Sequence, residues 1–217
     1  TQKRTRAMKN VKFHIFGVLM TLVASGLPRV VSRNVAYETG NRKMQAKSVS
    51  AGMVIALSIS VITCIILYLF PTIFDKISGT TGTSDILKYL LPALIFSSIY
   101  AIFRGSMWGT QNFFVISFSE FFEQIIRIAF IFILFAIPMN ISSGAKTGLS
   151  LTLSTVISSI FVTIMYFCLG NRLSSPSKKI LPLLKTSTPI TTVRTLSSAV
   201  SCIIALLIPA RLMLFGF

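Results

Sequence analysis

The feature that most restricts how this chain can fold is a run of 27 residues without a single charged side chain, from Ser48 to Phe74. Ile, Val, Leu and Ser make up most of the run. A helix rises 1.5 Å per residue, so about 20 apolar residues are enough to cross the hydrocarbon core of a bilayer. The run therefore predicts a transmembrane helix.

The composition of the whole chain extends this prediction from one helix to a bundle. Hydrophobic residues make up 53% of the 217 residues, charged residues only 12%, and the mean hydropathy is +0.79. These values are too apolar for an ordinary soluble domain and exclude a disordered chain. Phe is unusually frequent, with 18 residues, and small polar residues are spread through the apolar runs. Such a mixture is typical of lipid-facing helices with small residues at their contacts.

The apolar runs predict an all-α polytopic membrane bundle of about six transmembrane helices in a single membrane domain, residues 1–217. The predicted spans are about residues 13–31, 48–74, 86–103, 114–138, 147–171 and 195–215. Gly26 and Pro28 predict a break or cap near the end of the first span. The two glycines in residues 104–112 predict a tight turn between the third and fourth spans.

Basic residues greatly outnumber acidic ones, with 21 Lys and Arg against 5 Asp and Glu. They lie mostly between the apolar runs, which favours positive-inside topology and contact with anionic membrane lipids over nucleic-acid binding. The connections at 29–47 and 172–194 carry five basic residues each, against two at 76–88 and one at 139–146. The first two are therefore predicted to be cytoplasmic. Residues 1–12 also carry five basic residues. Because one span separates them from the connection at 29–47, this assignment places them on the opposite, non-cytoplasmic side, which the charge rule does not explain.

The fourth span begins with a charged stripe, which is the first candidate functional site. Glu120, Glu123, Gln124 and Arg127 are spaced three, four and seven residues apart, so they share one face of a helix. Charges at membrane depth are costly and normally face a bundle interior or a wet cavity. The stripe is either an ion pair that fixes helix packing or a site for substrate or proton coupling.

Two further arginines have alternative interpretations. Arg104 precedes Gly105 and is either a flank that reaches to the headgroups or a cation that binds phosphate at a cavity mouth. Arg33 has the same two interpretations and favours the flank. Gly105 and Gly109 are spaced as in a GxxxG helix contact, but their position in the predicted turn weakens that signal.

Chemistry that depends on cofactors is not indicated. Cys64, Cys168 and Cys202 lie singly in apolar segments, without metal-ligand or disulfide spacing, and are expected to pack. His14 has no acid or base partner in the sequence. Because nucleotide-binding glycine patterns are also absent, we expect no metal, no cofactor and no enzymatic activity.

Several of these features occur together in the order and spacing of a known group of proteins. They are residues 26–33 (GLPRVVSR), Arg104-Gly105 with Gly109, residues 119–127 (SEFFEQIIR) and residues 207–212 (LIPARL). In this combination the chain resembles the stage V sporulation protein B group of polysaccharide-biosynthesis membrane proteins. That group is part of the multidrug/oligosaccharidyl-lipid/polysaccharide exporter superfamily.

The resemblance implies a bundle of about fourteen helices in two lobes around a central cavity, in the bacterial plasma membrane. Such proteins move a lipid-linked sugar or peptidoglycan precursor between leaflets by alternating access. This chain would supply the second to seventh helices, so the first helix and the second lobe are expected elsewhere in the same protein. The chain starts at Thr1 rather than Met, which also suggests a fragment. It departs from the group in its basic leader at 1–12 and in Ala210, where the group usually has a second Arg.

On this basis Arg33, Arg104 and Arg127 are the predicted cations for a lipid-linked anionic glycan. Glu123 would keep Arg127 extended, or compete with the substrate so that binding is reversible. The alternatives are a cation-coupled multidrug or metabolite exporter, in which Glu123 takes a proton or an ammonium group, and a structural membrane protein that transports nothing. A membrane-bound enzyme is disfavoured by the lack of paired acids and bases.

Overall fold

The computed structural model describes residues 26–69, 83–138, 142–175 and 180–214, and every regular element in these ranges is a helix. The six helices are α2 (Leu27–Tyr37), α3 (Arg42–Leu69), α5 (Thr83–Gly109), α6 (Phe113–Ala136), α7 (Ser143–Cys168) and α8 (Ile180–Leu214). The predicted all-helical membrane bundle is thus confirmed. Most of the predicted first span, residues 13–25, and the leader at 1–12 lie outside the described residues.

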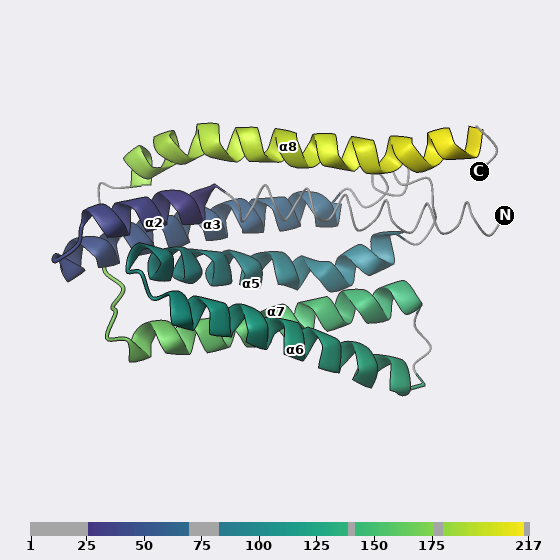
Figure 1. The fold of residues 1–217 in the computed structure, drawn as a ribbon, viewed down its shortest axis with the longest axis horizontal. Helices are drawn as coiled ribbons and strands as arrows, with labels where there is room; N and C mark the ends of the chain where they lie inside the picture. Colours follow the sequence, from purple (N-terminus) through teal and green to yellow (C-terminus); the bar gives the residue numbers. More distant parts are fainter. Residues whose placement is uncertain (1–25, 70–82, 139–141, 176–179, 215–217) are drawn as a thin grey trace.

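The helices lie side by side along the long axis of the molecule (Figure 1). Helix α5 is central and packs against α2, α3, α6 and α7, whereas α8 packs against α2 and α3. The connections at 38–41, 110–112 and 169–175 lie at one end of the bundle, which we call the loop end (Figure 1). The loop end thus gathers the two basic connections that the charge distribution predicts to be cytoplasmic.

Among the described residues, three helices are long and apolar enough to cross a membrane by length and composition alone. They are α3, the Lys88–Gly109 part of α5, and α7. Helix α6 has 24 residues, which is also a sufficient length, but its three charged side chains lie within the apolar stretch, whereas the three of α3 are confined to its first six residues.

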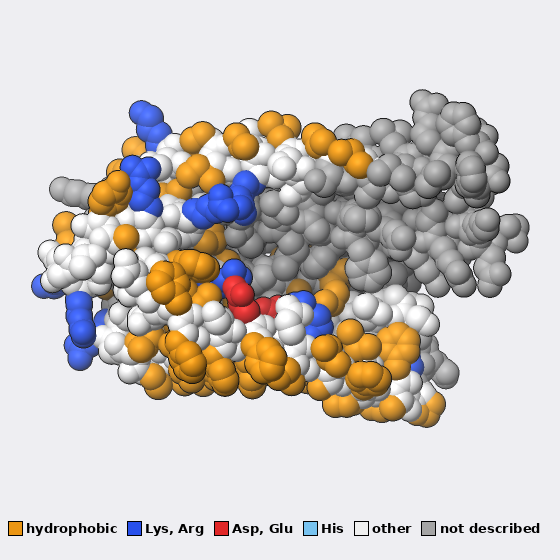
Figure 2. Space-filling model, in the orientation of Figure 1, with side chains coloured by type: hydrophobic (Ala, Val, Ile, Leu, Met, Phe, Trp, Pro, Cys, Tyr) orange, Lys and Arg blue, Asp and Glu red, His pale blue; other side chains and the backbone are white. Residues whose placement is uncertain are grey.

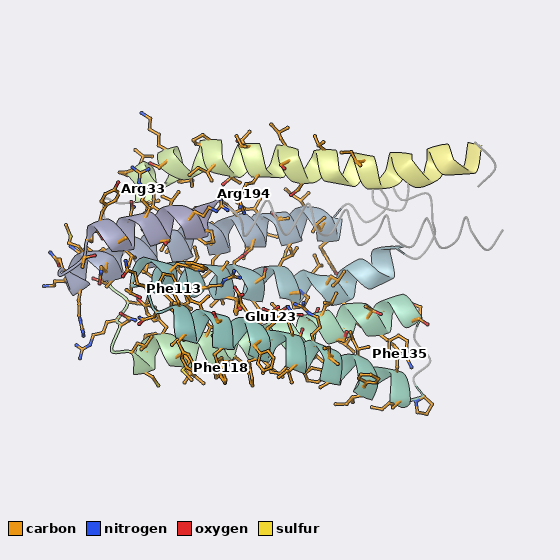
Figure 3. All side chains as sticks on the ribbon, in the orientation of Figure 1. Arg33, Phe113, Phe118, Glu123, Phe135 and Arg194 are labelled. Carbon is orange, nitrogen blue, oxygen red and sulfur yellow. The ribbon has the colours of Figure 1, made fainter. Side chains whose placement is uncertain are left out.

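The charged stripe and the lipid-facing surface occupy different sides of α6. The exposed apolar side chains of α6 recur at helical spacing. They include Phe114, Phe118, Phe121, Ile125, Ile128 and Phe132. Glu123 lies between them and α5 (Figure 3), and Ser119 on the same inner side is buried. The aromatic side of α6 favours an apolar environment, so the charged stripe on the other side of the helix is turned toward α5.

The contact between α5 and α7 is built from small polar residues. The buried hydroxyl residues of α7 are Ser150, Thr152, Ser154, Thr155, Ser158 and Ser159. Most of these hydroxyls donate to carbonyls three or four residues earlier in α7, for example from Thr155 Oγ1 to the Leu151 oxygen at 2.8 Å. Thr152 also donates across the contact to the backbone carbonyl of Tyr89 at 2.5 Å. Small side chains allow close approach while their hydroxyls stay bonded.

The predicted turn at 104–112 is wrong for most of its length. Helix α5 continues to Gly109, and the turn is confined to 110–112, where Gln111 has a left-handed φ of 59°. The two glycines serve a helix contact instead. A Cβ on Gly105 would lie 2.5 Å from the carbonyl oxygen of Pro28 in α2, and a Cβ on Gly109 would lie 2.5 Å from that of Ser32. The GxxxG spacing therefore marks the surface on which α2 packs against α5.

Much of the two basic connections is helical. Helix α8 begins at Ile180, so residues 180–194 are helical, and only 38–41 separate α2 from α3. Arg42, Lys43 and Lys47 therefore lie on the first turns of α3, and Arg194 lies further inside α8. The predicted boundary between connection and helix differs from the structure because charge indicates the edge of the hydrocarbon region. Charge does not indicate where a helix begins or ends.

Candidate functional site

The stripe on α6 folds into the arrangement that its spacing predicts. Arg127 forms an ion pair with Glu123, one turn earlier, and its Nη1 donates to Gln124 Oε1 at 3.0 Å. The acidic residue precedes the basic one by four positions, which is the favourable order on a helix. Both acceptors hold the Arg127 guanidinium against the side of α6.

A second ion pair joins α6 to α5. Arg104 Nη2 lies 2.5 Å from Glu120 Oε1, and the two side chains are 39% and 43% exposed. Because Arg104 lies within α5 and not in a turn, its side chain reaches sideways to the neighbouring helix. We call Arg104, Glu120, Glu123 and Arg127 the charged quartet.

Tyr100 lies one helical turn before Arg104 and completes the site. Its buried hydroxyl interacts with the Glu123 carboxylate as well as with Arg104 and Glu120, but without a hydrogen bond of ordinary geometry. The buried Nε of Arg127 also lacks a partner. Buried polar groups are normally satisfied, so two such donors beside one charged cluster leave hydrogen-bonding capacity for a ligand.

The charged quartet is neither sealed in the core nor turned to the lipid-facing side. The side chains of Arg127 and Glu123 are 28% and 15% exposed. Figure 2 shows the carboxylates in the middle of one face of the molecule, with blue side chains on either side of them. Arg127 is fourteen residues beyond the first residue of α6, a distance of about 21 Å from the loop end. The quartet therefore borders an open face of the described bundle, and Arg127 lies well inside the length of α6.

The charges of the quartet cancel. Each arginine has its own carboxylate, so the four groups carry no net charge when all are ionised. The expected arginine-dominated, anion-attracting surface is not what these four residues form. An anion would bind here by displacing a carboxylate from an arginine, not by meeting an unpaired cation.

The structure brings together three of the four predicted binding residues. Arg104, Glu123 and Arg127 belong to the quartet, whereas Arg33 stands apart near the loop end (Figure 3). The Arg33 side chain is exposed and its guanidinium carbon lies 5.4 Å from the ring centre of Tyr37. A role for Arg33 in binding stays a prediction, with no contact to the quartet in its support.

Sequence reasoning missed one residue of the site, Tyr100, and the position of one further arginine, Arg194. Tyr100 is four residues before Arg104, a spacing that would have placed it on the same face had 104–112 been read as helix. The sequence predicts Arg194 at the end of the basic connection, but it is half-buried in α8, fourteen residues from Ile180, the start of that helix (Figure 3). Arg127 and Arg194 therefore lie at similar distances along helices that start at the loop end.

Comparison with known proteins gives one match. A family model described as "Polysaccharide biosynthesis protein" matches residues 9–213. No curated protein and no solved structure matches the chain.

Proposed function

The chain belongs to the polysaccharide biosynthesis protein family, and from this premise we propose that it forms part of a flippase in the bacterial plasma membrane. The cargo is a lipid-linked oligosaccharide or cell-wall precursor, carried between leaflets by alternating access. The observation that best supports the proposal is the charged quartet on the open face of the bundle, with two unsatisfied donors beside it.

The chemistry of the cargo explains why such a site is needed. A pyrophosphate headgroup is anionic and does not cross hydrocarbon unaided, whereas its lipid tail is stable within the hydrocarbon of the bilayer. The exposed aromatic side of α6 is suited to acyl chains. The opposite side offers guanidinium groups, which bind phosphate oxygens through two parallel hydrogen bonds. The other wall of the passage comes from the second lobe expected from the resemblance.

In the proposed cycle, the carboxylates act as reversible competitors of the cargo. Without cargo, Glu120 and Glu123 neutralise Arg104 and Arg127 and keep two charged side chains tolerable at membrane depth. A phosphate oxygen replaces Glu123 at Arg127 and accepts hydrogen bonds from the free Nε and from the Tyr100 hydroxyl. When the site opens to the other leaflet, the carboxylate returns and the cargo leaves.

One observation also favours a second candidate, a cation-coupled exporter. Two carboxylates lie side by side on α6 at membrane depth, and Glu123 is the less exposed of the pair. A protonated Glu123 would release Arg127 without any anionic cargo. The two candidates differ in the charge of the molecule that is moved.

The charge of the cargo is therefore the test. The full-length protein is reconstituted in vesicles, and movement of three probes between leaflets is followed. The probes are a polyprenyl pyrophosphate-linked sugar, the matching uncharged polyprenyl glycoside and a lipophilic amine. We expect the pyrophosphate lipid to move at least about tenfold faster than the uncharged glycoside. A preference for the amine would support the exporter, and equal rates for all three would contradict both candidates.

A further inference from the structure

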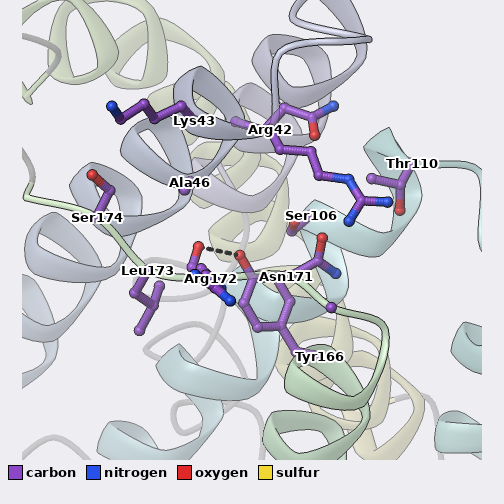
Figure 4. Close-up of a pocket in the computed structure, with 12 residues that line it drawn as sticks. Arg42, Lys43, Ala46, Ser106, Thr110, Tyr166, Asn171, Arg172, Leu173 and Ser174 are labelled. Atoms are coloured by element: carbon purple, nitrogen blue, oxygen red, sulfur yellow. Dashed lines mark hydrogen bonds between the residues drawn. The ribbon is translucent and has the colours of Figure 1, made fainter.

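A separate cavity lies at the loop end of the bundle, between α3, α5, α7 and the 169–175 connection (Figure 4). Its volume is about 470 Å³, which is within the usual range of ligand sites. The lining includes Arg42, Lys43, Ser106, Tyr166, Asn171 and Arg172. Three residues of the whole lining are basic and none is acidic.

The cavity has a buried polar floor and a basic mouth. Ser106 and Tyr166 are buried at its base, whereas Arg42 and Arg172 are exposed. Figure 4 shows the guanidinium group of Arg42 extending between Thr110 and Asn171, while Lys43 points away. The guanidinium groups of Arg42 and Arg172 thus line the cavity together with amide and hydroxyl groups, which is a suitable set of donors for phosphate oxygens.

The wall of the cavity is held in place by specific contacts. The Tyr166 hydroxyl donates to the backbone carbonyl of Arg172 at 3.4 Å, and the Ser174 N–H donates to Ser50 Oγ at 3.0 Å. Gly170 has φ +74°, which allows the chain to leave α7 sharply, and a Cβ there would lie 3.6 Å from Arg42 Nη1. The 169–175 connection is thus tied to both α7 and α3, so the cavity is pre-formed.

The cavity is distinct from the charged quartet, although both involve α5. Ser106 follows Arg104 by two residues, which turns its side chain about 200° around the helix. Arg104 points to α6 and Glu120, whereas Ser106 lines the cavity with Tyr166 of α7. Within the quartet, Glu123 and Arg127 lie further along α6 from the loop end than the cavity does.

We propose that this cavity binds a phosphate group, carried by an anionic lipid headgroup or by a free phosphate, with Arg42 as the main cation. Basic pockets between transmembrane helices suit anionic headgroups, because the guanidinium lies near the headgroups while the helices contact the acyl chains. The missing carboxylate is the key contrast with the quartet. A ligand here displaces no internal partner within the cavity lining, so the site is expected to be occupied for long periods and to stabilise the loop end.

Binding is measured on the full-length protein in lipid nanodiscs, with Arg42→Gln as the test variant. The first probe is phosphatidylglycerol in phosphatidylcholine discs, with retained lipid counted by native mass spectrometry. The second is inorganic phosphate, followed by calorimetry in discs of phosphatidylcholine alone. We expect Arg42→Gln to weaken the binding of at least one probe about tenfold, because a charge-assisted bond is lost.

The controls separate the two ligand sources and exclude a general charge effect. Lys47→Gln removes a positive charge from α3 outside the cavity lining and should leave binding unchanged, whereas Arg42→Lys should retain part of it. Loss of phosphatidylglycerol alone indicates a headgroup, and loss of inorganic phosphate indicates a free anion. Wild-type binding of both probes by Arg42→Gln, or equal losses with Lys47→Gln, would overturn the proposal.

Discussion

Replacing Arg127 with Ala is expected to abolish movement of the pyrophosphate-linked lipid while the protein still accumulates in the membrane. The variant loses the deepest guanidinium of the quartet and both hydrogen bonds that hold it to Glu123 and Gln124. Loss of a charge-assisted contact in a partly desolvated site corresponds to about a 100-fold fall in rate. Initial rates in reconstituted vesicles, normalised to the folded protein, measure this fall.

Two further variants separate a transport role from a packing role for Arg127. Arg127→Lys keeps the charge but loses bidentate binding, so it should transport slowly and fold normally. Lys185→Ala removes an exposed charge from α8 and should change neither property. If Arg127→Ala transports at the wild-type rate, the quartet is only an interhelical contact and the proposed role is wrong.

The second large effect is expected at Gly105, on protein stability. An added Cβ would lie 2.5 Å from the Pro28 carbonyl oxygen and 2.9 Å from its Cα, and backbone atoms cannot rotate away as a side chain can. Gly105→Ala should therefore push α2 away from α5 and lower the free energy of unfolding by about 3 kcal/mol, the upper part of the range for overpacking. Thermal unfolding in lipid discs measures the loss.

Gly52→Ala is the matched control for this prediction. Its Cβ would also meet an atom at 2.5 Å, but that atom is Cγ2 of the Val31 side chain. Shortening the side chain with Val31→Ala should therefore relieve the clash in the double variant, as a double-mutant cycle would show. No side-chain truncation at position 28 should rescue Gly105→Ala. Equal and small effects of both alanines would contradict the close backbone contact between α2 and α5.

The sequence was sufficient for the features that depend on local periodicity. Long uncharged runs predicted the helices, since backbone groups in hydrocarbon must bond within the segment. The i,i+4 spacing predicted the pairing of Glu123 with Arg127, because both residues are on one helix and the geometry is fixed by its pitch.

Features that depend on contacts between helices were not predictable in the same way. The pairing of Arg104 with Glu120 requires knowing that α5 continues past residue 104 and lies beside α6. Gly105 and Gly109 have the composition of a turn, and only the position of α2 shows that they serve a close contact. The basic residues of 172–194 predict a connection that ends at Arg194, whereas only the packing of α8 against α2 and α3 shows that this helix already begins at Ile180.

The central claim is that the quartet borders a wet passage and not a lipid-facing or sealed surface. The direct measurement is the reactivity of single cysteines toward a charged, membrane-impermeant thiol reagent, in the full-length protein with its native cysteines replaced. We predict that Gln124→Cys, beside Arg127, reacts rapidly and is protected by the pyrophosphate-linked lipid, whereas Ile125→Cys, about 100° further around α6 on the aromatic side, stays unreactive. Equal reactivity at the two positions, or an inert Gln124→Cys, would contradict it.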